Sequence, residues 1–153
     1  MKHLLFGFLF ILSLSLYSQE HHHPEFEIGL SSGVVYNFSE KEPALGIHLH
    51  LIKSLGESDH FGMGLGYECI FDDHKHNTVS IIFLYRPIEH LSLNFAPGIS
   101  FKLSDKSSIS PTLHVEAIYE FEFGHFHLGP LVGFAISTED IHASVGVHLA
   151  LGF

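Results

Sequence analysis

The chain has 153 residues, with 17 acidic and 7 basic side chains and a formal net charge of −10 when histidine is counted as neutral. This excess of acid excludes nucleic acid as an expected partner, because nucleic-acid binding needs a basic surface. The length predicts one domain, and the single cysteine, Cys69, excludes an internal disulfide. The 15 histidines are well above ordinary usage, so a prediction of function depends mainly on where they lie.

The first segment, residues 1–18, has the pattern of a secretory signal peptide. Lys2 begins a short polar start, residues 4–16 form an apolar run, and the small residue Ser18 ends the segment. The apolar run is too short for a membrane helix, whereas this order of features is typical of a cleaved signal. We therefore expect a mature chain outside the cytoplasm that begins with a histidine-rich periplasmic tail, residues 19–25.

The remainder, residues 26–153, alternates apolar and polar side chains with period two. Turn residues recur at regular intervals, and this combination predicts strands rather than helices. Eight strands are expected: 26–38, 45–53, 61–71, 78–86, 91–103, 112–123, 126–136 and 143–153. Pro97 and Pro130 fall inside two of these strands and are expected to interrupt the ladders, because proline donates no backbone hydrogen bond.

The two faces of the predicted strands differ in composition. One face is bulky and apolar, and the other combines glycine with polar side chains. The polar face includes Glu27, Gly29, His48, His50, Gly66, Glu68, Arg86, His114, Glu116, Glu120 and His148. A soluble sandwich or lipocalin-like barrel would place its bulky apolar face inside. Glycine on the polar face instead predicts a narrow polar interior and a lipid-facing apolar exterior, in a sheet that must close.

The chain ends in SVGVHLALGF, with Val145, Val147, Leu149, Leu151 and Phe153 in phase. This ending resembles the assembly signal of Gram-negative outer-membrane β-barrels, and residues 26–153 resemble the small eight-stranded class that holds OmpA-like and OmpX-like proteins. The resemblance implies an all-β fold, a closed antiparallel transmembrane β-barrel with up-and-down meander order. It also implies a cell outer-membrane location with the N-terminus in the periplasm. Expected partners are outer-membrane lipid and the barrel assembly machinery, and we expect a monomer.

Histidines in the tail, in one loop and on the predicted inner face point to a metal. Imidazole is the commonest protein ligand for transition metals and suits Zn, Ni and Cu(II). The candidate ligands are His21, His22, His23, His74, His76, Asp72, Asp73, His48, His50, His114, Glu116 and His148. The first strand is expected to pair with both the second and the last. Glu27 and His148 are therefore expected near His48 and His50.

These ligands favour a non-enzymatic outer-membrane barrel that binds or responds to divalent transition metals, with no required cofactor. One alternative is a structural or partner-binding surface barrel whose histidines fill the lumen beside glutamates. Another is a pH sensor built on the same histidines. A minor alternative is a hydrolase, since His142 and Ser144 slightly resemble the His-x-Ser element of lipid A deacylases. Valine follows that serine, and no carboxylate is expected beside it to support activation.

Overall fold

The computed structural model describes residues 24–56, 60–73, 75–102 and 109–153. The predicted signal peptide and His21, His22, His23 and His74 lie outside these ranges. The strands are β1 (Phe26–Asn37), β2 (Glu42–Leu55), β3 (Phe61–Phe71), β4 (His76–Ile88), β5 (Leu91–Lys102), β6 (Ile109–Tyr119), β7 (Phe121–Phe123), β8 (Phe126–Ser137) and β9 (Ile141–Gly152). Within the described ranges, no helix is long and apolar enough to cross a membrane.

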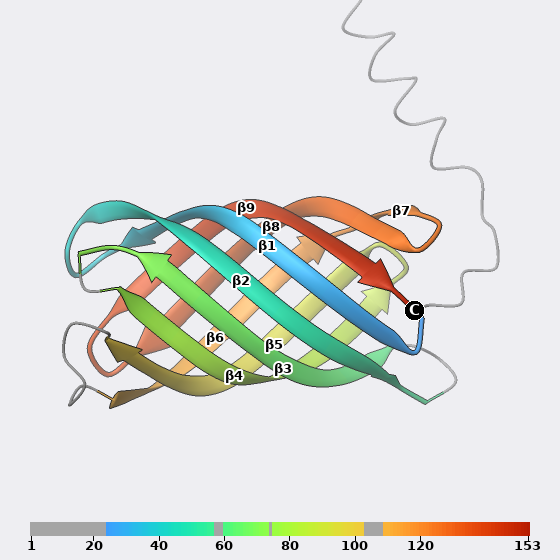
Figure 1. Cartoon of the computed structure of the whole chain (residues 1–153), viewed down its shortest axis with the longest axis horizontal. Coiled ribbons are helices and arrows are strands. Elements are labelled where there is room, and N and C mark those ends of the chain that lie inside the picture. The colour runs from blue at the N-terminus through green and yellow to red at the C-terminus, as the bar shows by residue number, and fades with distance from the viewer. Residues whose placement is uncertain (1–23, 57–59, 74, 103–108) are drawn as a thin grey trace, which may run out of the picture.

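The strands close into one antiparallel barrel (Figure 1). Neighbours in the chain pair from β1 to β6, β8 pairs with β9, and β9 closes onto β1. Both β6 and β7 pair with β8 in one continuous register, so together they form a single barrel strand. The predicted eight-stranded up-and-down meander is confirmed.

Both prolines interrupt ladders as predicted. On β5, pairing with β4 is lost beside Pro97, between the Ser80–Gly98 and Phe83–Phe95 pairs. On β8, Pro130 stands opposite the end of β6, where the predicted strand 112–123 divides at Glu120. In each case a residue without a backbone N–H leaves a gap in the hydrogen-bonded ladder.

Several strands are longer than predicted, because polar residues assigned to loops still pair with their neighbours. Glu42 pairs with Asn37 at the start of β2, and His76 pairs with Lys102 at the start of β4. The placement of His76 in a loop was therefore wrong. Alternation identifies strand centres, but backbone pairing continues past the last apolar residue and fixes the ends.

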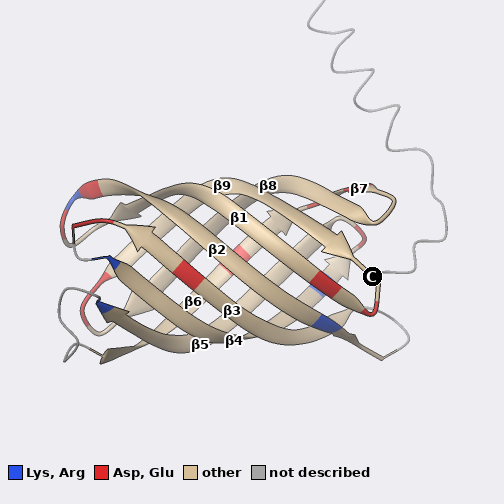
Figure 2. Ribbon diagram, viewed as in Figure 1, with Lys and Arg blue, Asp and Glu red and all other residues tan. Residues whose placement is uncertain are grey.

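The barrel has two distinct ends. At the termini end, Phe26 and Phe153 exchange backbone hydrogen bonds of 3.0 and 2.8 Å. The opposite end, here called the loop end, carries the connections between β1 and β2, β3 and β4, and β8 and β9. Figure 2 shows that most charged residues lie at or near these two ends, while the strands between are largely uncharged.

The predicted faces are confirmed, with one difference. Bulky apolar side chains point outward, and Leu65, for example, is 63% exposed. The buried interior holds histidine, glutamate, serine, asparagine and Arg86, but it also holds a cluster of apolar residues from β2, β4 and β5. This cluster comprises Ile52, Ile82, Leu84 and Ala96. Other strands add buried apolar side chains such as Val35, Ile118 and Leu131, so the inner face mixes polar and apolar residues.

Candidate metal centre

Glu27, His50 and His148 meet inside the barrel and are here called the inner cluster. One donor atom from each lies within 4.8 Å of the other two. They come from three adjacent strands, because β1 pairs with β2 on one side and with β9 on the other. All three side chains are buried, and His148 is 0% exposed. This confirms the expectation that Glu27 and His148 lie near His50.

Gly29 makes room for the two imidazoles of the inner cluster. The rings of His50 and His148 are stacked, with centroids 5.1 Å apart and an interplanar angle of 16°. A Cβ on Gly29 would lie 2.7 Å from Cε1 of His148 and would also overlap the His50 ring. Contacts this short do not occur in folded proteins, so any larger residue at position 29 would displace the stacked pair.

Contacts beyond the cluster orient the Glu27 carboxylate. Its Oε2 accepts a hydrogen bond from Nη2 of Arg86 at 3.0 Å and lies 3.2 Å from Nδ1 of His127. Its Oε1 faces Nε2 of His50 at 3.4 Å. One carboxylate oxygen is thus held by the surrounding network while the other points at the imidazoles.

The second imidazole is oriented by a serine. Nδ1 of His148 lies 3.0 Å from Oγ of Ser31. Its Nε2 is buried and makes no hydrogen bond to the residues that the structure describes. When Nδ1 donates to the hydroxyl oxygen, Nε2 carries the lone pair that a metal ion requires, and such outer contacts fix the tautomer of metal-binding histidines.

The remaining luminal candidates form pairs across strands. His48 and Glu116 contact each other, with 3.2 Å between Nδ1 and Oε1. His114 shares the inner face with Glu116 as predicted, yet its Nδ1 lies 3.4 Å from Oε2 of Glu68 instead. Neither His48 nor Glu116 belongs to a three-donor group within the described residues. Alternation fixes which face these side chains share but not their partners.

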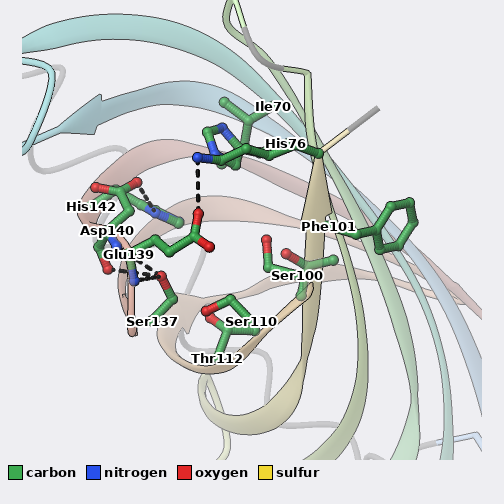
Figure 3. A pocket seen from close by; sticks show the side chains of 12 residues that line it. Ile70, His76, Ser100, Phe101, Ser110, Thr112, Ser137, Glu139, Asp140 and His142 are labelled. Atoms are coloured by element: carbon green, nitrogen blue, oxygen red, sulfur yellow. Dashed lines mark hydrogen bonds and ion pairs between the residues drawn. The ribbon is translucent and has the colours of Figure 1, made fainter. Parts of the chain in front are cut away.

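A second three-donor group lies nearer the loop end. Glu68 of β3, His114 of β6 and His142 of β9 each offer one donor atom within 4.8 Å of the other two. Figure 3 shows His142 beside Asp140, and Nδ1 of His142 lies 3.5 Å from Oδ2 of that aspartate. Neither Glu68 nor His142 was predicted to be a ligand. No carboxylate was expected beside the His142–Ser144 element, and the position of Asp140 corrects that expectation.

The candidate ligands in and beside the β3–β4 connection do not all come together. Asp72 and His76 are in direct contact, and the His76 backbone N–H donates to Oδ1 of Asp72 at 3.3 Å. Asp73 is exposed and takes no part in this contact. Burial alone would raise the pKa of Asp72, but the hydrogen bonds and charge of His76 and the Lys75 backbone N–H outweigh burial and lower this pKa below its ordinary value.

The Asp72–His76 contact predicts an acid-dependent change in the β3–β4 connection. Because the folded state lowers the Asp72 pKa, its stabilising effect is present above the unfolded value of about 4 and is lost as pH falls through the folded value. After correction for the pH dependence of intrinsic amide exchange, we expect the hydrogen-exchange protection of the His76 amide to fall as the pH is lowered through this range. In Asp72→Asn that protection should be lower and independent of pH, whereas Asp73→Asn should behave as the parent. An unchanged pH profile in Asp72→Asn would contradict this assignment.

The geometry defines a class, the small closed eight-stranded antiparallel barrels with an apolar exterior. Neisserial surface protein A (NspA) is similar, with a TM-score of 0.63 and 7% identity over 87% of this chain and 100% of that chain. The N-terminal β-barrel domain of Pseudomonas aeruginosa OprF has a TM-score of 0.57 and 14% identity, over 86% of this chain and 100% of that chain. A de novo designed transmembrane β-barrel has a TM-score of 0.56 and 13% identity, over 87% of this chain and 100% of that chain. These likenesses show a shared fold. No protein-family model and no curated protein matches the chain.

Proposed function

We propose that this chain is a monomeric, non-enzymatic barrel of the outer membrane, with its N-terminus in the periplasm, that binds a divalent transition metal ion at the inner cluster. The membrane location is supported by the outward apolar face, which continues around the barrel through side chains such as Leu65, Phe83 and Val145. An apolar surface of this extent is rare on soluble monomers and suits lipid.

The observation that carries the metal proposal is the space at Gly29, which lets two buried imidazoles stack beside the Glu27 carboxylate. Two nitrogens and one oxygen suit Zn²⁺, Ni²⁺ or Cu²⁺. Tetrahedral ligands with bonds of about 2.1 Å lie roughly 3.4 Å apart. Donor atoms already within 4.8 Å therefore need only small side-chain rotations to reach that spacing. A fourth position would remain for water.

The structural alternative rests on a histidine that shares Glu27 with the inner cluster. Nδ1 of His127 lies 3.2 Å from Glu27 and 3.4 Å from Glu120, and these three residues also form a three-donor group. This histidine bridges two carboxylates as polar filling would. The hydrolase alternative is weaker. Nε2 of His142 makes no hydrogen bond to Ser144 or to any other described residue, so no base is positioned to activate the hydroxyl.

The decisive variant is Gly29→Ala, which removes no donor atom. In calorimetric titrations of the refolded full chain with Zn²⁺, we expect saturable micromolar binding for the parent. Gly29→Ala should lose one equivalent or weaken it by about tenfold or more, because the new Cβ displaces both imidazoles.

Gly62→Ala is the matched control for this variant. It is also a glycine of the inner face, but a Cβ there meets the ends of Ile52 and Leu84 at 2.9 and 3.0 Å and lies 3.2 Å from the Lys53 carbonyl oxygen. These side-chain ends can shift, and none is a metal donor, so binding should match the parent. Equal binding by Gly29→Ala and the parent would overturn the proposal. The histidines would then be filling of a structural or partner-binding barrel.

A further inference from the structure

The second three-donor group, Glu68, His114 and His142, is here called the mouth cluster. It shares no residue with the inner cluster. The rings of His114 and His142 meet edge to face, with centroids 5.4 Å apart. The His114 side chain is nine-tenths buried, and its Nε2 makes no hydrogen bond to the described residues. Nε2 of His142 is also a buried atom that makes no hydrogen bond to the described residues. One buried and one half-buried imidazole therefore each keep a nitrogen available beside a carboxylate.

A carboxylate outside the mouth cluster orients one of these rings. Oδ2 of Asp140 lies 3.5 Å from Nδ1 of His142, and the same oxygen accepts a hydrogen bond from Asn37 at 2.8 Å. A carboxylate on Nδ1 holds the proton there and leaves Nε2 as the metal ligand, which is the usual arrangement behind metal-binding histidines. Asp140 thus occupies the position of a supporting residue rather than a ligand.

One member of the mouth cluster, His142, lines a cavity at the loop end. This cavity has a volume of about 120 Å³, with room for more than one water molecule. Its described lining includes five carboxylates and neither lysine nor arginine. These carboxylates belong to Glu40, Glu42, Asp72, Asp73 and Asp140. Carboxylates of one sign around a concave entrance raise the local concentration of cations.

We infer that the mouth cluster is a second divalent-metal site, accessible from the loop end and independent of the inner cluster. Two imidazoles and one carboxylate favour Zn²⁺, Co²⁺ or Ni²⁺ over Ca²⁺ and Mg²⁺, which prefer oxygen ligands. Water entering from the cavity supplies the open coordination position. This inference goes beyond the proposed function, because it needs neither Glu27, His50 nor His148 to bind a metal.

Co²⁺ is a suitable probe, because its visible absorption reports on the ligands and geometry of each bound ion. We expect the refolded full chain to bind two Co²⁺ ions in the lumen, in addition to any bound by the tail. His142→Gln should lose one of them, Gly29→Ala the other, and the double variant both. His125→Gln removes one exposed turn histidine that belongs to no three-donor group among the described residues, and it should bind Co²⁺ as the parent does.

Asp140→Asn keeps every ligand of the mouth cluster and should weaken that site alone by about tenfold. Co²⁺ binding by His142→Gln equal to that of the parent would overturn the inference. If His142→Gln does not fold, as judged by circular dichroism, an unchanged affinity in Asp140→Asn would overturn it instead. A loss confined to Gly29→Ala would support the inner cluster and reject the mouth cluster, whereas a loss confined to His142→Gln would do the reverse.

Discussion

Replacing Arg86 with methionine is expected to lower the free energy of unfolding by about 3 kcal/mol, because it removes the guanidinium beside a buried carboxylate. Nη2 of Arg86 lies 3.0 Å from Oε2 of Glu27, and both side chains are at most 5% exposed. Methionine retains most of the apolar stem, so the loss reports mainly on the charge. Breaking a buried ion pair typically costs about 3–5 kcal/mol. We expect the lower end of this range, because His127 lies 3.2 Å from the same oxygen and remains as a partner of Glu27.

The measurement is reversible urea unfolding in lipid vesicles, with a chelator present so that bound metal does not contribute. Glu27→Gln/Arg86→Met serves as the control. It removes both charges, so it should recover part of the stability that Arg86→Met loses. A loss below about 1 kcal/mol in Arg86→Met, the usual value of an exposed ion pair, would contradict the buried-pair assignment.

The inner cluster could be predicted from the sequence because its three strands are neighbours. Period-two alternation assigned Glu27, His50 and His148 to one face, and closing the sheet placed β1 between β2 and β9. Once the strand ends are roughly known, the register of adjacent strands places these residues at similar positions along the barrel axis. The stacking of the rings and the need for Gly29 follow from atomic packing, which alternation does not describe.

The mouth cluster could not be predicted in the same way. Glu68, His114 and His142 lie on β3, β6 and β9, and no two of these strands pair. Their contacts cross the interior, so they depend on the diameter of the barrel and the stagger of its strands. The sequence predicts that Glu68 and His114 face inward, whereas His142 lies outside the predicted strand 143–153. The sequence does not show which of the inward histidines and carboxylates meet across the lumen.

The inner-face glycines of β3 illustrate a further limit. The sequence alone is compatible with two roles for these glycines, easing strand curvature or making room for a large neighbour such as Arg86. The structure instead places Ile52 and Leu84 against Gly62, and His48 and Ile82 against Gly66. Glycine on an inner face signals that some large side chain needs the space. Its identity is decided by the neighbouring strands and includes apolar residues that the pattern did not assign to the interior.

Replacing Leu65 with arginine is expected to destabilise the barrel by about 2–4 kcal/mol in a bilayer, because a charge would face lipid near the middle of a strand. Leu65 lies at the centre of β3 and pairs with Leu51 and Ile81, which also point outward. Phe71→Arg is the matched control, since Phe71 is also exposed and outward but ends β3 at the loop end. Near the interface, the same charge should cost only about 0–1 kcal/mol.

Unfolding of both variants in vesicles, and again in a zwitterionic detergent, separates a bilayer effect from a local one. A lipid bilayer has a low-dielectric centre and polar interfaces, so the cost of arginine should depend on depth. Local packing would instead give similar losses at both positions, because each site exchanges one large exposed apolar side chain for arginine. Equal losses for Leu65→Arg and Phe71→Arg in vesicles would contradict a bilayer around the apolar face. A loss at Leu65 that exceeds the loss at Phe71 and shrinks in detergent would support the membrane location on which the proposed function depends.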